Sequence, residues 1–277
     1  MSNPAMTVRS AATVLLARDG DAGIEVFMLR RNLNSDFVGG AYVFPGGKVD
    51  ESDRFDAELA AVCGGFSDAD ASARLGVESG GLAQFVAAIR ECFEEAGVFL
   101  ARNESGVNVA LDDEPEFWAD TRRDVYEGKI RIAQVCRDRG LELEVDQVEY
   151  FSHWITPVGP PRRFDTRFFV ARMPDGQTPL HDGGETVASA WVSVESALER
   201  QRAGDFEMIF PTIMNLRDVS RFDTVDALMA DAAGRTDIPA IMPRIVIRDG
   251  VPTPLIEGDE GFEEASDNWL APDSIRP

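Results

Sequence analysis

Glu91, Glu94 and Glu95 stand close together at the end of the first third of the chain. At the ~100° per residue of an α-helix they fall within about one quadrant, opposite an apolar face. Like charges at this spacing repel by roughly a few tenths of a kcal/mol per pair. Two interpretations are open: the solvated face of a surface helix, or carboxylates that share a hard divalent cation such as Mg²⁺.

The residues around these glutamates form a longer motif. Arg90, the three glutamates and Gly97 match the pattern REUxEExGU, where U is a bulky aliphatic residue, and Gly46 and Gly47 stand upstream. This stretch resembles the Nudix box, which runs Gly, five residues, Glu, seven residues and then REUxEExGU. By composition alone, five fixed residues would match about once per million start positions. The chain is therefore identified as similar to the Nudix hydrolase superfamily.

The box departs from the pattern in three places. Counted from Gly47, Asp53 stands where the first Glu is expected, and Cys92 replaces an aliphatic residue. An insertion also stretches the seven-residue spacer, so Arg90 comes late. An interrupted box that follows a Phe-Pro-Gly-Gly stretch resembles the branch that includes the mammalian peroxisomal coenzyme A diphosphatase.

The resemblance implies metal-assisted hydrolysis of a diphosphate linked to another moiety. Mg²⁺ or Mn²⁺ would shield the phosphoryl charge and acidify the attacking water. Arg90 is expected to pair with one glutamate and fix its rotamer. The resemblance implies these metal ligands: Glu91, Glu94, Glu95, Glu185 and a backbone carbonyl at Gly47.

Two of the candidate residues carry open alternatives. Glu185, in the stretch Asp-Gly-Gly-Glu-Thr before an expected strand, is either a metal ligand or general base, or an ordinary turn acid. His153 lies in an aromatic strand, where a packed residue is more common than a catalytic one. Arg31, Arg162 and Arg163 are candidates for facing the substrate phosphates, and a surface position is the alternative for the last two.

The identity of the diphosphate is left open. Coenzyme A diphosphatases carry an upstream motif of Arg, three residues, Gly, three residues and FPGG. Gly40 fits this motif, but Asp36 stands at the Arg position. Coenzyme A or acyl-coenzyme A is one candidate, and ADP-ribose, NADH or a nucleotide sugar is the alternative. A non-catalytic Nudix-like binding or regulatory domain is the alternative from another class.

The composition limits the partners. The chain has 277 residues, 44% of them hydrophobic, and a formal net charge of −22. This acidity argues against nucleic-acid binding, which needs a basic footprint. The three cysteines form no CxxC pair, so we expect a reducing, cytoplasmic location. No apolar run has the ~18 residues that a membrane span needs, and we expect a small-molecule partner, with a homodimer left open.

The elements that must position the glutamates can be read from the apolar pattern. A helix is expected over 82–96, with Gly97 as its left-handed C-cap. Strands are expected on both sides of it, at 13–17, 25–29, 41–44, 145–156, 163–171 and 186–194, and helices follow at 195–202 and within 211–232. The predicted fold is α/β: a Nudix-type α/β/α sandwich with a mixed β-sheet. We expect one domain over 1–257, helical insertions at 54–81 and 103–140, and an acidic mobile tail over 258–277.

Overall fold

The structure is a computed structural model that describes residues 8–33, 39–54, 57–160, 162–248 and 250–265. It begins with the predicted hairpin, in which β1 (Arg9–Gly20) pairs antiparallel with β2 (Gly23–Arg31). Gly23 adopts a φ of 102° at the turn, a conformation readily available only to glycine.

Six further strands join this hairpin in one mixed sheet. They are β3 (Tyr42–Val43), β4 (Gly46–Lys48), β7 (Glu149–Ile155), β8 (Phe164–Arg172), β9 (Thr186–Ser193) and β10 (Ala240–Ile241). The main path of the sheet is β10-β7-β8-β1-β2-β3, with β4 beside β1 and β9 beside β2. β1 is parallel to β8, and β7 is parallel to β10, whereas the other pairs are antiparallel. β4 was not predicted, because its three residues, Gly-Gly-Lys, have low strand propensity.

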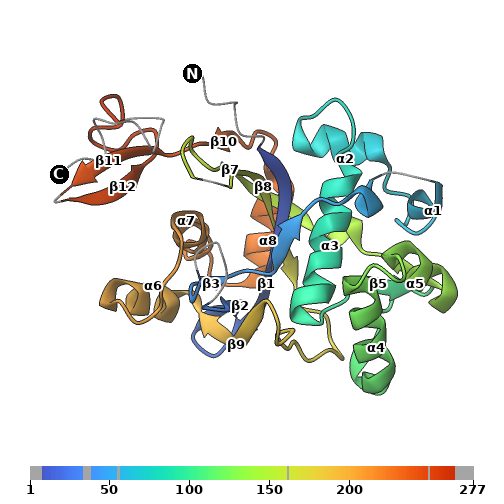
Figure 1. The fold of residues 1–277 in the computed structure, drawn as a ribbon. Helices are drawn as coiled ribbons and strands as arrows, with labels where there is room; N and C mark the ends of the chain where they lie inside the picture. Colours follow the sequence, from blue (N-terminus) through green and yellow to red (C-terminus); the bar gives the residue numbers. More distant parts are fainter. Residues whose placement is uncertain (1–7, 34–38, 55–56, 161, 249, 266–277) are drawn as a thin grey trace.

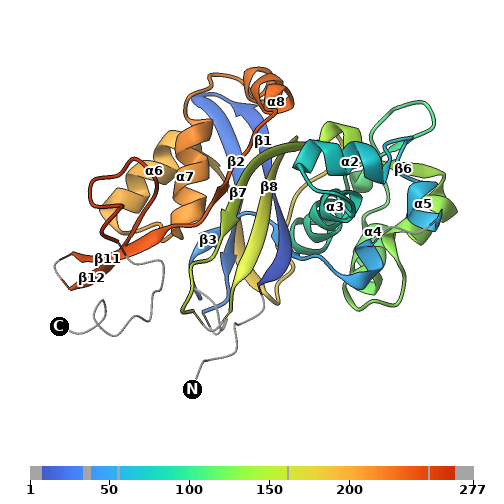
Figure 2. The same cartoon turned by 90° about the horizontal axis from the view of Figure 1, so that it is seen from above.

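Helices cover both faces of this sheet (Figures 1 and 2). They are α1 (Ala57–Ala60), α2 (Asp68–Leu75), α3 (Leu82–Ala96), α4 (Pro115–Tyr126), α5 (Ile132–Arg139), α6 (Val194–Ala203), α7 (Phe210–Val219) and α8 (Val225–Gly234). One apolar core lies between the sheet and the helices α2 to α5, and a second lies between the sheet and α6 to α8. The predicted α/β/α sandwich is confirmed.

Helix α3 has the bounds that the sequence predicts. The Asp68 carboxylate of α2 accepts hydrogen bonds from the backbone N–H groups of Gly80 and Leu82 at 2.9 and 3.0 Å, and so satisfies N–H groups at the helix start. At the other end Gly97 has a φ of 65° and its N–H bonds the Phe93 carbonyl, as a left-handed cap requires. The helix that carries the glutamates is therefore fixed at both ends.

The two stretches predicted as helical insertions both carry helices. Residues 54–81 contain α1 and α2, and residues 103–140 contain α4 and α5 between the short paired strands β5 (Ala101–Asn103) and β6 (Leu141–Leu143). The division into one domain and a tail stays a prediction. A hairpin of β11 (Arg244–Arg248) and β12 (Val251–Leu255) precedes the tail. Residues 258–265 form turns beside it, and 266–277 lie outside the described residues.

None of the helices in the described ranges combines the length and the apolar character that crossing a membrane requires.

Candidate active site

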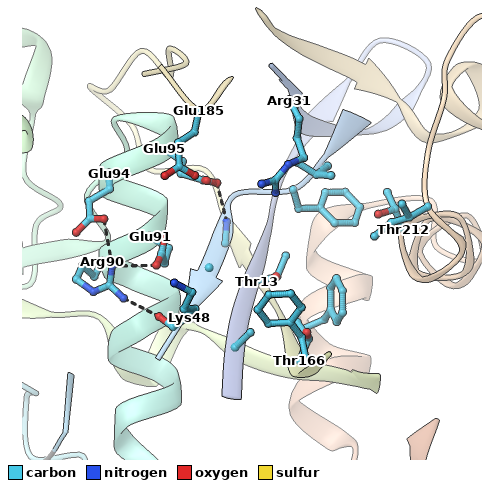
Figure 3. Close-up of a pocket in the computed structure, with 18 of the residues that line it drawn as sticks. Thr13, Arg31, Lys48, Arg90, Glu91, Glu94, Glu95, Thr166, Glu185 and Thr212 are labelled. Carbon is cyan, nitrogen blue, oxygen red and sulfur yellow. Dashed lines mark hydrogen bonds and ion pairs between the residues drawn. The ribbon is translucent and has the colours of Figure 1, made fainter. Parts of the chain in front are cut away.

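The sheet opens where β1 exchanges partners. β1 pairs with β2 only over residues 17–20 and with β4 over residues 11–13, while β2 continues beside β3 and β9. A cavity of about 540 Å³ is lined by residues from both branches, from α3 and from α7. Figure 3 shows four glutamates on one side of it and Arg31 and Thr212 across from them. We call the side formed by Glu91, Glu94, Glu95 and Glu185 the acidic wall.

The glutamates of α3 are not solvated. Glu94 and Glu95 are only 9% and 7% exposed, and the Glu91 side chain is 12% exposed. The interpretation as the solvated face of a surface helix is therefore wrong. The helix pattern predicts a polar face, but β4 and the loop before β9 pack against that face and remove it from water.

Arg90 holds this wall together. Its Nε and Nη2 donate to the two carboxylate oxygens of Asp53 at 2.7 and 2.9 Å. Its Nη1 donates to Glu91 and Glu94 at 2.9 and 3.1 Å, and its Nη2 also donates to the Lys48 carbonyl at 2.9 Å. These bonds use all five N–H groups of the guanidinium, so Arg90 fixes carboxylates rather than facing a substrate.

Asp53 is the buried anchor of that arginine. It is 1% exposed and also accepts a hydrogen bond from the Asp50 backbone N–H at 2.8 Å. It does not line the cavity. The residue at the first Glu position of the box thus acts through Arg90.

The acidic wall is electrostatically unfavourable as it stands. Burial, together with the charge of Glu94, raises the pKa of Glu91 to about 7 even though Arg90 opposes the shift. Burial and the charges of Glu91 and Glu185 hold the pKa of Glu95 well above its ordinary value. One Glu95 oxygen accepts a hydrogen bond from the Gly46 N–H at 2.9 Å. Added positive charge would stabilise this cluster.

Gly47 allows α3 and β4 to approach each other. A Cβ atom at this position would lie 2.4 Å from the Glu91 Oε1, which is closer than van der Waals contact permits. Glycine at this position thus makes room for the Glu91 carboxylate.

Glu185 reaches the cavity from a rigid turn. The Asp182 carboxylate accepts hydrogen bonds from the backbone N–H groups of Gly184, Glu185 and Thr186 at 3.2, 2.9 and 2.9 Å. These bonds lower the pKa of Asp182 against the opposing effect of its burial. The Glu185 side chain lines the same cavity as the α3 glutamates, and its role as a metal ligand or general base rather than an ordinary turn acid stays a prediction.

The side of the cavity across from the acidic wall, which we call the opposite wall, mixes cations and apolar groups. Arg31 and Thr212 lie across from the glutamates (Figure 3), and we count with them the cavity-lining residues Arg162, Phe164, Phe168 and Ile209. Of the three predicted substrate arginines, Arg31 and Arg162 lie here. Arg163 does not, because its Nε donates to the carbonyls of Thr156 and Pro157, both at 3.0 Å.

Two further residues discussed from the sequence are His153 and Asp36, and a third, Lys48, was not predicted. His153 lies outside the cavity and its Nε2 is 2.5 Å from the Asp165 carboxylate, so it is a packed, hydrogen-bonded residue as its strand context suggested. Lys48 lines the cavity and was missed, although its position directly after Gly46 and Gly47 could have indicated it. Asp36 lies outside the described residues.

Tyr126 is the other residue that sequence reasoning missed. It ends α4 in the second insertion, lines the cavity, and its hydroxyl lies 3.4 Å from Glu185 Oε1. The charge of Glu185 raises the pKa of this phenol. No local pattern in the insertion marks this tyrosine, and only the packing of α4 against α3 brings it to the site.

Comparison with known proteins identifies the family. Residues 66–219 match the NUDT19 Nudix domain family. The chain belongs to the Nudix hydrolases of the NUDT19 family. It is 31% identical over 267 residues to a Gallus gallus protein named acyl-coenzyme A diphosphatase NUDT19, covering 79% of this chain and 70% of the relative. The Homo sapiens protein of the same name is 27% identical, covering 88% and 74%.

A solved Nudix structure supports the same assignment. The NUDIX hydrolase from Alicyclobacillus acidocaldarius is 28% identical, with a TM-score of 0.66 over 81% of this chain and 96% of that one. The family match begins after Gly47 and includes the α3 glutamates and Glu185. The protein is thus a Nudix enzyme, and the predicted superfamily and branch are confirmed.

Metal ligation by the Nudix-box residues stays a prediction. Across the described ranges, no three His, Cys, Asp or Glu side chains are arranged as a ready set of metal ligands. Arg90 binds Glu91 and Glu94, and the Gly46 N–H binds Glu95. The donors nevertheless fit a hard cation, since all are oxygens. Burial and then the charges of Glu91 and Glu185 raise the pKa of Glu95, and a bound cation would relieve this repulsion.

Proposed function

We propose that this protein is a metal-dependent diphosphatase that cleaves the diphosphate linkage of coenzyme A or an acyl-coenzyme A. The observation that carries the proposal is the cavity, in which an acidic wall faces cations set beside an apolar surface. The similarity to relatives named acyl-coenzyme A diphosphatase, over most of both chains, supports the substrate class.

The acidic wall would hold the cation. We assign Glu91, Glu94, Glu95 and Glu185 to Mg²⁺ or Mn²⁺. When bound, the cation neutralises charge on the diphosphate and acidifies water. Arg90 keeps Glu91 and Glu94 in place, and Glu185 serves either as a ligand or as the base that accepts the proton of the attacking water.

A backbone carbonyl from β4 is the further proposed ligand. Pro45 and Val49 bond the neighbouring strand β1, whereas the Gly46 N–H bonds Glu95 and the Lys48 carbonyl bonds Arg90. Along a strand, the N–H and C=O groups of alternate residues point to opposite edges. Gly46 and Lys48 therefore point away from β1, whereas Gly47, like Pro45 and Val49, points toward it. The carbonyl of Gly46 is therefore better oriented toward α3 than that of Gly47, the position expected from the sequence.

The opposite wall would bind the rest of the substrate. Arg31 and Arg162, with Lys48 from β4, offset the phosphate charge in a chain whose net charge is −22. Phe164 and Ile209 supply an apolar surface that suits a pantetheine or acyl chain. This wall would accept the substrate only in the orientation that brings its diphosphate to the glutamates.

A nucleotide-type diphosphate such as ADP-ribose, NADH or a nucleotide sugar is the second candidate. It is favoured by Asp36, which occupies the Arg position of the coenzyme A motif. A non-catalytic binding domain is not favoured, because all three α3 glutamates of the box are present.

Mass spectrometry of the products decides between the two substrates. With saturating Mg²⁺ or Mn²⁺, coenzyme A should give 3′,5′-ADP and 4′-phosphopantetheine. Efficient release of AMP from ADP-ribose or NADH, with coenzyme A left intact, would favour the second candidate. A metal-replete protein that hydrolyses no diphosphate in a broad panel would exclude both.

A further inference from the structure

The second insertion reaches the acidic wall through one side chain. Tyr126, at the end of α4, lies with its hydroxyl 3.4 Å from Glu185 Oε1. The residue is 52% exposed, so its ring is not needed to fill the core. Among the described residues, this is the contact from the 103–140 insertion to the side chain of a proposed metal ligand.

The end of α4 is fixed relative to both sources of the acidic wall. Arg122, one turn before Tyr126, donates from Nε to the Glu94 carbonyl at 2.8 Å. Its guanidinium also lies beside Asp182, whose charge raises the pKa of Arg122 against a larger lowering by burial. In addition, the Leu180 N–H bonds the Ala96 carbonyl at 2.9 Å and ties the loop before β9 to the end of α3. Arg122 thus ties the end of α4 to α3, next to the loop that carries Glu185.

The backbone and the side chain of Glu185 are held separately. Asp182 fixes the backbone of the turn. The Glu185 side chain has the Tyr126 hydroxyl as its hydrogen-bond donor in the described part of the chain. A phenol donates to a carboxylate, and catalytic hydrogen bonds that are long in a ligand-free site shorten when the site is filled.

We infer that Tyr126 is a positioning residue that orients the Glu185 carboxylate toward the metal-binding wall, so that the insertion helix α4 contributes directly to the reaction. This inference deepens the proposed function and rests on it. It assigns the insertion a role in the chemistry in addition to any role in recognition.

A double-mutant cycle between Tyr126 and Glu185 tests the inference. The variants are Tyr126→Phe, Glu185→Gln and the double variant. We expect Tyr126→Phe to lower kcat about 10-fold with KM nearly unchanged, the low end of what partners of metal ligands contribute. In the Glu185→Gln background the same change should have no further effect, because the carboxylate it orients is gone.

A second readout does not depend on turnover. Mn²⁺ affinity, measured by electron paramagnetic resonance on the same four proteins, should weaken by a few-fold to about 10-fold in Tyr126→Phe and show the same non-additivity. Tyr150→Phe is the matched control, because this buried hydroxyl has no hydrogen-bond partner among the described residues and lies outside the cavity. It should leave kcat and Mn²⁺ affinity unchanged.

The outcomes separate the inference from the proposed function. An active enzyme in which Tyr126→Phe changes neither kcat nor Mn²⁺ affinity, or changes them equally with and without Glu185, overturns the positioning role and leaves the function intact. A protein that shows the coupled loss of Mn²⁺ affinity but hydrolyses no diphosphate supports the positioning role and overturns the function.

Discussion

The two walls of the cavity are assembled in different ways. Three of the four carboxylates of the acidic wall come from a single turn of α3 and are held by Arg90 or by the Gly46 N–H, and two of them, Glu94 and Glu95, are buried. The opposite wall takes its residues from β2, β8, α7 and the loops beside them. The first wall is a local motif, whereas the second exists only because distant segments fold together. This difference explains why the reaction class can be read from the chain more readily than the substrate.

The largest effect is expected from replacing Arg90, which holds two glutamates of the acidic wall. Arg90→Met leaves the buried Asp53 carboxylate without its partner, and breaking a buried ion pair from one side costs about 3–5 kcal/mol. The free energy of unfolding from urea titration measures this loss. Arg54→Met, which removes an arginine from an exposed surface pair with Glu51, should change stability by less than about 1 kcal/mol. Equal effects of the two substitutions would contradict the anchoring role of Arg90.

Glu95→Gln should remove activity while leaving the fold intact. The substitution keeps the side-chain shape but removes the charge of a proposed ligand. We therefore expect kcat to fall by more than the roughly 10–100-fold loss that follows substitution of residues supporting metal ligands. Steady-state kinetics with saturating Mn²⁺ give the value. Glu78→Gln, an exposed glutamate outside the cavity, is the control. Full activity of Glu95→Gln would exclude this site assignment.

Gly47→Ala tests the close approach of β4 to α3. The new Cβ would displace the Glu91 carboxylate, so we expect kcat to fall about 10-fold, as for other disturbed ligand supports. Because a flexible side chain can move, the melting temperature should change little. Gly234→Ala meets nothing within 4 Å and should leave kcat unchanged. Normal activity of Gly47→Ala would mean that Glu91 is not required in its present position.

The smallest effect is expected from a substitution in the opposite wall, and two neighbouring arginines should differ in this respect. Arg162→Gln should raise KM about 10-fold with kcat nearly unchanged, which corresponds to about 1.4 kcal/mol, the low end of what a hydrogen bond to a charged group contributes. Arg163→Gln should leave KM unchanged, because that guanidinium bonds backbone carbonyls outside the cavity. A reversed result would show that the recognition residues of this wall are wrongly assigned.

Much of the fold could be predicted because its signals are local. The α3 bounds follow from apolar periodicity and from Gly97, and the β1–β2 hairpin follows from two apolar runs around a glycine-containing turn. β4 was missed because its three residues are Gly-Gly-Lys, which carry no strand propensity. The strand forms because its backbone pairs with β1 on one side, while the Gly46 N–H and the Lys48 carbonyl bond side chains of α3 on the other.

The sequence by itself determined the predicted reaction centre of this protein. Arg90 and the three glutamates are adjacent on one helix, so their spacing alone brings them together and identifies the superfamily. Only the tertiary structure decided that these carboxylates are buried, that Arg162 rather than Arg163 lines the cavity, and that Tyr126 reaches Glu185. The physical reason is that side-chain burial and contacts across long sequence separations depend on how β4, α4 and the loop before β9 pack around α3, and no local pattern in those segments specifies that packing.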